Sequence, residues 1–159
     1  MGAASMTPDA FGASYLQVRL SSEFALADHI GVRVETADDT GLVLHAPLAA
    51  NANDKGTAFG GSLFSVSVLA GWAWLTRYLA HESCAADVVI QESRMQYLRP
   101  VCADFRAHLC LPAAADVDKF RRMLRRSARG RLGLRVEIRD GDGVATRFEG
   151  FYAAAIRPG

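Results

Sequence analysis

The residues best suited to chemistry are gathered in one segment, residues 51–62, with the sequence NANDKGTAFGGS. A loop rich in Asn, Asp and Gly that ends in Gly60 and Gly61 at the start of a helix exposes unpaired backbone N–H groups and the positive end of the helix dipole. Such an end can polarise a carbonyl group or hold an oxyanion, and glycines let a ligand approach the backbone. We therefore expect Gly60 and Gly61 to act on a carbonyl group.

Polar side chains in the same loop offer partners for that carbonyl or for a water molecule. Asn51 and Asn53 can hydrogen-bond either one, with Asn53 preferred, although asparagines in loops also commonly form turns. Asp54 can orient a catalytic water or close an Asx turn. Lys55 can meet a phosphate group or remain solvated. The other substrate contacts that we expect from this region and from the strands are Gly56, Phe59, Ser62 and Tyr97.

Glu92 is a second candidate carboxylate. It lies in an expected strand after the helix, on the same alternation face as Val88 and Ile90. An acid on an otherwise apolar face is a candidate functional group. Arg94 follows two residues later and can pair with Glu92 in a purely structural role, so the sequence leaves both interpretations open.

Basic residues are concentrated between residues 119 and 131. The segment contains Lys119, Arg121, Arg122, Arg125, Arg126, Arg129 and Arg131. On a helix they cover a broad face, where Arg125 and Arg126 can receive the phosphates of coenzyme A or the acidic surface of a carrier protein. The alternative is a solvated face that acids elsewhere balance.

Patterns for a nucleophile or a metal are weak in this chain. Ser62, Ser65 and Ser67 have no His or acid at a spacing that predicts a triad, so capping and helix packing explain them better. The 4 histidines all lie outside residues 51–62, which argues against a dehydratase that moves a proton with histidine. The 3 cysteines show no CxxC spacing, so we expect no disulfide framework, no metal site and a reduced, cytoplasmic setting.

Length and charge exclude further classes of protein. The 159 residues suit one domain with a full hydrophobic core. A net charge of +1 gives no overall field to attract nucleic acid or an anionic membrane. Residues 59–76 carry no charge but include serines and glycines, whereas a membrane span needs about 20 predominantly apolar residues. We expect a buried helix there, with neither a membrane span nor a nucleic-acid partner.

Apolar periodicity and turn residues divide the chain into elements. We expect a flexible tail over residues 1–10 and a single domain over residues 11–159. The predicted helices are 11–30 (one or two helices), 60–80, and 116–129, the last capped by Asp116 with Phe120, Met123, Leu124 and Ser127 facing inward. The predicted strands are 32–37, 42–46, 88–98, 105–111, 132–139 and 144–156. This order favours an α+β fold in which an antiparallel sheet curls around the long apolar helix.

Several motifs together resemble a known family. They are the pattern N-x-N-D-K-G-T-x-F-G-G-S-L-F-S from residue 51, Ala70-Gly71-Trp72, D-V-V-I-Q-E from residue 87, and Tyr97-Leu98-Arg99-Pro100-Val101. The chain resembles the hotdog-fold thioesterases over about residues 15 to 156. The most similar group is the one also found as the C-terminal half of some acetyltransferase fusion proteins. The resemblance implies the hotdog fold, a curved antiparallel sheet wrapped around a long central helix.

The resemblance also implies a function. Hotdog thioesterases hydrolyse thioesters of acyl-CoA or acyl-carrier protein at dimer interfaces, with the helix N-terminus polarising the carbonyl and a carboxylate assisting water. No cofactor is expected apart from the coenzyme A that belongs to the substrate. A homodimer or a dimer of dimers is expected, because an exposed sheet edge needs cover.

This chain departs from the family pattern at two positions. Many relatives have His-Gly-Gly at the helix start and an Asp about two turns later, whereas here Phe59 and Val68 occupy those places. A catalytic carboxylate must then come from elsewhere, and Asp54 and Glu92 are the candidates. The alternative hypothesis is a non-catalytic protein that binds acyl-CoA or a lipid-like ligand.

Overall fold

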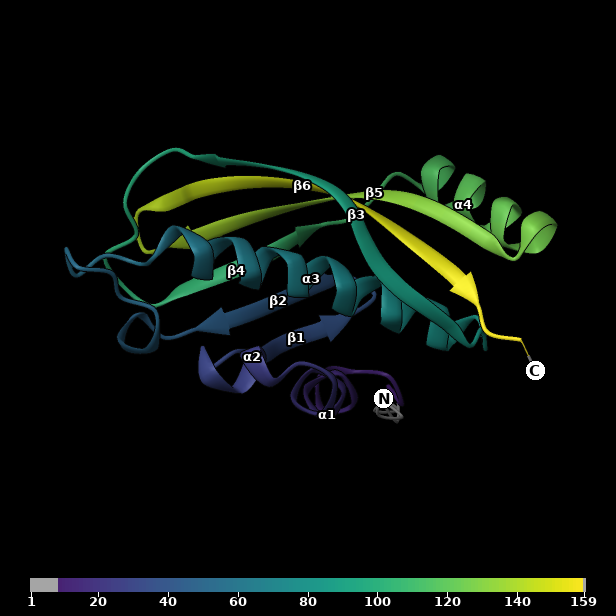
Figure 1. The fold of residues 1–159 in the computed structure, drawn as a ribbon, viewed down its shortest axis with the longest axis horizontal. Coiled ribbons are helices and arrows are strands. Elements are labelled where there is room, and N and C mark those ends of the chain that lie inside the picture. Colours follow the sequence, from purple (N-terminus) through teal and green to yellow (C-terminus); the bar gives the residue numbers. More distant parts are fainter. Residues whose placement is uncertain (1–8, 159) are drawn as a thin grey trace, which may run out of the picture.

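A computed structural model describes residues 9–158 of the chain (Figure 1). The elements in order are α1 (Ala13–Glu23), α2 (Ala25–His29), β1 (Arg33–Asp38), β2 (Gly41–Ala46), the short 3-10 helix η1 (Leu48–Ala50), α3 (Gly60–His81), β3 (Ala86–Tyr97), β4 (Phe105–Cys110), α4 (Ala114–Ser127), β5 (Arg129–Asp140) and β6 (Gly143–Ile156). The predicted helices and strands are all present, with ends shifted by a few residues.

The strands form one six-stranded sheet in the order β1-β2-β4-β5-β6-β3, and every neighbouring pair is antiparallel. Figure 1 shows this sheet curving around α3. The two edges differ. Helix α1 packs against β1, whereas no other strand of residues 9–158 pairs with the free edge of β3. The predicted α+β architecture is therefore confirmed, and it leaves one long strand edge open.

Buried and exposed residues alternate along β5, which shows why one face of the sheet is apolar. Leu132, Leu134, Val136 and Ile138 are all buried, whereas the alternate residues Arg131, Arg135 and Arg139 are exposed. This period of two places one face against α3, as the sequence predicts. Helix α3 is apolar on almost all sides, as expected of a helix enclosed by a sheet. Within residues 9–158, α3 included, no helix combines the length and apolar character that crossing a bilayer requires.

A missing side chain lets α3 approach the sheet. A Cβ atom at Gly71 would lie 2.2 Å from the hydroxyl oxygen of Tyr152 on β6. Tyr152 is fully buried, and its hydroxyl donates a hydrogen bond of 2.8 Å to the carbonyl of Val68. Because burial disfavours the phenolate, the pKa of Tyr152 is raised. The ring therefore needs glycine at position 71 in order to reach α3.

Helix α4 differs in detail from the prediction. It begins at Ala114, its N-cap is Ala113, and no side chain caps it, so Asp116 lies inside the first turn. Phe120 and Leu124 are buried as predicted, but Met123 and Ser127 are exposed. Phe120 and Leu124, four residues apart, mark the buried side of the helix. Met123 and Ser127 lie next to that side and remain in solvent.

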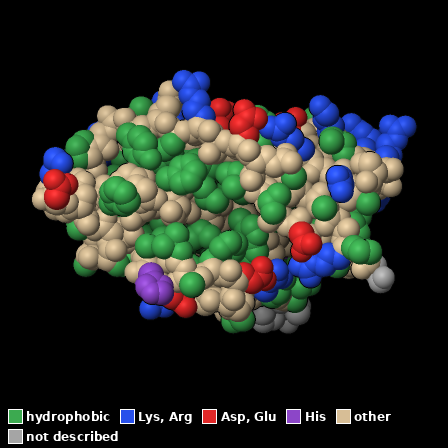
Figure 2. Space-filling view, viewed as in Figure 1, with side chains coloured by type: hydrophobic (Ala, Val, Ile, Leu, Met, Phe, Trp, Pro, Cys, Tyr) green, Lys and Arg blue, Asp and Glu red, His purple; other side chains and the backbone are tan. Residues whose placement is uncertain are grey.

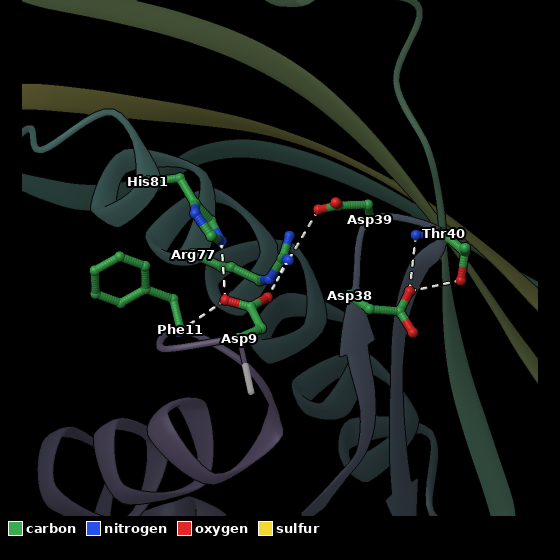
Figure 3. A network of polar contacts seen from close by, with 7 residues as sticks. All are labelled: Asp9, Phe11, Asp38, Asp39, Thr40, Arg77 and His81. Carbon is green, nitrogen blue, oxygen red and sulfur yellow. Dashed lines mark hydrogen bonds and ion pairs between the residues drawn. The ribbon is translucent and has the colours of Figure 1, made fainter. Parts of the chain in front are cut away.

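The N-terminal part of the chain is tied to α3 by an ion-pair network (Figure 3). The buried guanidinium of Arg77 donates to a carboxylate oxygen of Asp9 and, over 3.1 Å, to Asp39. His81 lies 3.3 Å from the other oxygen of Asp9, which also accepts the backbone N–H of Phe11. Of the predicted flexible tail, residues 1–8 lie outside the described residues, whereas Asp9 is held in place.

Replacing Gly71 with Ala is expected to lower the free energy of unfolding by about 3 kcal/mol, because the added Cβ overpacks the contact with Tyr152. Tyr152→Phe, which removes only the hydrogen bond, should cost about 1 kcal/mol. Gly141→Ala is the matched control, since a Cβ there meets nothing within 4 Å. Urea unfolding monitored by tryptophan fluorescence measures all three. Equal stability of the two glycine variants would contradict the packing described.

The Asp9 network predicts a pH dependence of stability. The hydrogen bond from Arg77 is the main reason that the pKa of the Asp9 carboxyl is lowered. A lowered pKa stabilises the fold above the unfolded-state value of about 3.9, and this stabilisation is lost as the pH falls through the folded-state pKa. Asp9→Asn should therefore cost about 2 kcal/mol at neutral pH and progressively less in acid.

Urea unfolding at several pH values measures this difference. Asp39→Asn is the control, because the Asp39 side chain is 96% exposed and its ion pair is expected to contribute little. A cost for Asp9→Asn that did not change with pH would show that the charge of Asp9 is not what stabilises the fold.

Candidate active site

The loop before α3 is anchored at its base by Asn51. This side chain is 3% exposed, and its amide nitrogen donates to the carbonyls of Ile30 and Pro47 over 2.9 and 2.7 Å. The backbone carbonyl of Asn51 accepts the N–H of Phe59 over 2.7 Å. The amide oxygen of Asn51 is buried without a partner among the described residues. Asn51 therefore holds the two ends of the loop together.

Asn53 closes a turn within the loop. Its side-chain oxygen accepts the backbone N–H groups of Lys55 and Thr57, and its amide nitrogen donates to the Thr57 hydroxyl over 2.9 Å. Gly56 completes the turn with φ +74, a left-handed conformation that favours glycine. Of the two roles that the sequence allows for Asn53, this geometry is that of the turn former.

Asp54 and Lys55 lie on the outside of that turn. Their side chains are 80% and 75% exposed and pair with each other over 3.1 Å. A pair so open to water contributes little to stability. The structure therefore places both side chains in solvent, with no hydrogen bond from Asp54 to the start of α3 in the part of the chain that it describes.

The start of α3 presents free backbone donors. Phe59 is the N-cap residue, no side chain caps the helix, and the first turn holds no acid. The N–H groups of Ser62 and Leu63 both donate to the carbonyl of Phe59. In residues 9–158 the N–H groups of Gly60 and Gly61 meet no acceptor, so they and the positive end of the helix dipole remain available to a ligand.

Two aromatic rings flank this opening. The Tyr97 hydroxyl donates to the carbonyl of Gly60 over 3.0 Å, and a Cβ at Gly60 would lie 3.4 Å from the Tyr97 ring. A Cβ at Gly61 would lie 2.3 Å from the ring of Phe59, which is 58% exposed. We call the free N–H groups and the two rings the Gly60-Gly61 opening. It brings together four predicted site residues, Phe59, Gly60, Gly61 and Tyr97.

The serines at the start of α3 have mainly local roles. Ser65 and Ser67 donate to the carbonyls of Gly61 and Leu63, one turn earlier, over 2.8 and 2.9 Å. Ser62 is half-buried beside the opening. Bonds of this kind are typical of serines within helices, in line with the packing role that the sequence favours for Ser65 and Ser67.

Glu92 lies on the opposite face of β3 from the one predicted. A β-bulge at Gln91 shifts the register between Ile90, which pairs with Tyr152, and Glu92, which pairs with Phe151. Because one extra residue reverses the alternation, Glu92 does not share the face of Val88 and Ile90. Its carboxylate is exposed and accepts a 2.7 Å hydrogen bond from Arg131, not from Arg94.

Arg125 and Arg126 occupy the last turn of α4 and are exposed. In the described part of the chain neither one forms an ion pair, whereas Arg121 pairs with Asp118 over 2.6 Å. The two arginines therefore remain free to bind an anion, but no contact joins them to the Gly60-Gly61 opening.

Sequence reasoning did not identify one pair of charged residues that lies near α3 in the structure. Arg19 and Glu23 on α1 form an ion pair and line a hollow beside Trp72. Their spacing of four residues is the only signal in the sequence, and it is common on helices in general. Only the folded chain brings this pair to the side of α3.

Comparison with known proteins shows the family to which the chain belongs. The family model described as "Putative thioesterase (yiiD_Cterm)" matches residues 13–156. A protein of unknown function from Chlorobaculum tepidum TLS is 30% identical, with a TM-score of 0.87 over 98% of this chain and 100% of that chain.

Two further solved structures share the fold at lower identity. One is a thioesterase, described as putative, from Shewanella oneidensis, 21% identical with a TM-score of 0.81 over 91% of this chain and 97% of its own. The other, described as a probable thioesterase, is from Pseudomonas aeruginosa, 19% identical with a TM-score of 0.77 over 91% and 95%. The chain has the hotdog fold, and it belongs to the thioesterase family that this model describes.

Proposed function

We propose that this protein hydrolyses thioesters of acyl-CoA or acyl-carrier protein at the Gly60-Gly61 opening. The observation that carries this proposal is the pair of N–H groups at Gly60 and Gly61, which have no acceptor in residues 9–158 and lie at the positive end of a 22-residue helix. Membership of the thioesterase family supports the same class of substrate.

The opening supplies the electrophilic half of the reaction. The thioester carbonyl oxygen accepts the two N–H groups, which stabilise the negative charge that develops when water attacks the carbonyl carbon. The carbon–sulfur bond then breaks, and the thiol leaves. Tyr97 fixes the position of the Gly60 carbonyl, and the turn closed by Asn53 fixes the loop that leads into the opening.

The protein acts as a homodimer in this proposal. Figure 2 shows apolar side chains gathered at the centre of the face that carries α3. Five apolar residues of α3 and β3 pack against the core and stay partly exposed, namely Phe64, Val68, Val88, Ile90 and Met95. The free edge of β3 adjoins it. A second copy, related by a two-fold axis, covers both features because it offers the same edge and the same uncharged face.

Arg125 and Arg126 provide the charge that this substrate class requires. Coenzyme A carries phosphates, and a carrier protein presents an acidic surface, so either one gains from free guanidinium groups. In this proposal α4 attracts the carrier, and the opening acts on the thioester.

A non-catalytic ligand-binding protein is the second candidate. The observation that favours it is that, in residues 9–158 of a single chain, no hydrogen bond or ion pair joins a carboxylate or histidine to the opening. Such a protein would bind the thioester and leave it intact.

Gly61→Ala tests the opening directly. The added Cβ displaces the Phe59 ring and crowds the N–H donors, so kcat/KM for acyl-CoA hydrolysis should fall by about 100-fold, the effect of losing one oxyanion donor. Gly141→Ala should keep the wild-type rate. Release of thiol from a panel of acyl-CoAs and acyl-carrier proteins, followed with a trapping dye, measures both. Background rates for the wild type, with a raised Tm in acyl-CoA, would establish the non-catalytic candidate instead.

Ile90→Glu tests the dimer. A carboxylate on the apolar side of β3, next to the free edge of that strand, has no partner there, so the two-fold interface should be lost and the protein should sediment as a monomer. Val18→Glu is the matched control, because Val18 is 68% exposed on α1. A wild-type protein that is monomeric at micromolar concentration in analytical ultracentrifugation would contradict the proposed assembly.

A further inference from the structure

A hollow of about 300 Å³ lies between α1, the second half of α3 and the start of β3. It is lined by Arg19, Glu23, Trp72, Thr76 and Val88, among others. Glu23 is one of two carboxylates in its lining. The other, Asp87, accepts a 2.7 Å hydrogen bond from Arg157.

Glu23 is held in a fixed position with one oxygen free. Its Oε1 atom accepts the Nε–H of Arg19, and in residues 9–158 nothing donates to Oε2. Arg19 is itself fixed, because it donates to the Tyr15 hydroxyl over 2.7 Å and its guanidinium lies 5.7 Å from the ring centroids of Tyr15 and Trp72. The carboxylate is 39% exposed beside the hollow, within reach of water.

The direction of β3 relates the hollow to the opening. Tyr97, at the end of β3, contacts Gly60 at the start of α3, whereas Val88, near the start of β3, lines the hollow with Trp72 and Thr76. The strand thus runs antiparallel to the helix. The opening lies at one end of the apolar face and the hollow lies at the other.

A two-fold axis exchanges these two ends. A self-complementary interface places its axis near the middle of the shared face, so each element meets the opposite end of its copy. The Gly60-Gly61 opening of one subunit then faces the hollow of the other. This step rests on the dimer in the proposed function.

We propose that the partner subunit's Glu23 is the carboxylate that completes the active site. Glu23 takes a proton from water while the water oxygen forms a bond to the thioester carbon. The carbonyl π electrons move to the oxygen, which the N–H groups of Gly60 and Gly61 hold. When the carbonyl re-forms, the carbon–sulfur bond breaks and the proton passes from Glu23 to sulfur. The products are a free acid and a thiol. Arg19 is a positioning residue for Glu23.

Glu23→Gln is the first test. If Glu23 is the base, kcat should fall by about 100-fold or more, with KM little changed. Asp87→Asn, which alters the other carboxylate of the hollow, is the matched control and should retain the wild-type kcat. A merely structural ion pair on α1 contributes little to stability, so in that case Glu23→Gln would keep its activity, and the inference would be wrong.

Mixed dimers are the second test, because they show which chain supplies the carboxylate. Glu23→Gln and Gly61→Ala subunits are unfolded together and refolded at equal concentration. About half of the dimers are then mixed, and each mixed dimer regains one complete site, which gives about a quarter of wild-type activity. If Glu23 served its own chain's opening, every site would keep one defect and no activity would return.

The outcomes separate the two proposals. A wild-type protein without hydrolytic activity would overturn the proposed function and this inference with it. An active wild type with an unimpaired Glu23→Gln variant would overturn only the role of Glu23. An inactive Glu23→Gln variant that fails to complement Gly61→Ala, while both sediment as dimers, would overturn the exchange across the two-fold axis.

Discussion

The close approach of α3 to the sheet is the constraint on which the rest of the structure depends. The Tyr152 ring packs against the helix only because Gly71 lacks a side chain. The hydrogen bond from its hydroxyl to the carbonyl of Val68 fixes the rotation of the helix about its axis. That rotation decides which side of α3 is enclosed by the sheet and which side is left for another molecule. At the helix start a separate hydrogen bond, from the Tyr97 hydroxyl to the carbonyl of Gly60, holds the same helix against β3.

Charge is distributed unequally along α3. The first turn has neither an acid nor a side-chain cap, whereas the later turns carry Arg77 and His81, both paired with Asp9. An acid in the first turn would compensate the positive end of the helix dipole and compete with a bound oxyanion. The ionic contacts of Arg77 and His81 with Asp9 therefore lie at the far end of the helix, and no acid competes for the N–H groups in its first turn.

Local sequence patterns were enough to predict most of the fold. Alternation in β5, the Asp and Gly turns, and the long apolar run of α3 each have one dominant structural meaning, so six strands and the central helix could be predicted. The helix opening could also be predicted, because Gly60 and Gly61 follow a loop and precede that run. Asn53 could not be assigned one role, since the same side chain suits a turn and a substrate, and only the folded loop distinguishes them. Arg19 and Glu23 gave no signal, because their importance depends on which distant elements they adjoin.

The bulge in β3 determines which side chains of that strand face the helix, because one extra residue reverses the alternation beyond it. Ile90 faces the helix, and Tyr97, seven residues later, also faces it, which a regular strand would forbid. The inserted Gln91 supplies the odd step. Removing Gln91 would leave a regular strand in which Ile90 and Tyr97, then six residues apart, still share the helix-facing side. Closing the bulge without removing a residue would instead turn the tyrosine away from the opening and bring Glu92 to the side of Ile90, so the site depends on how the strand accommodates one extra residue.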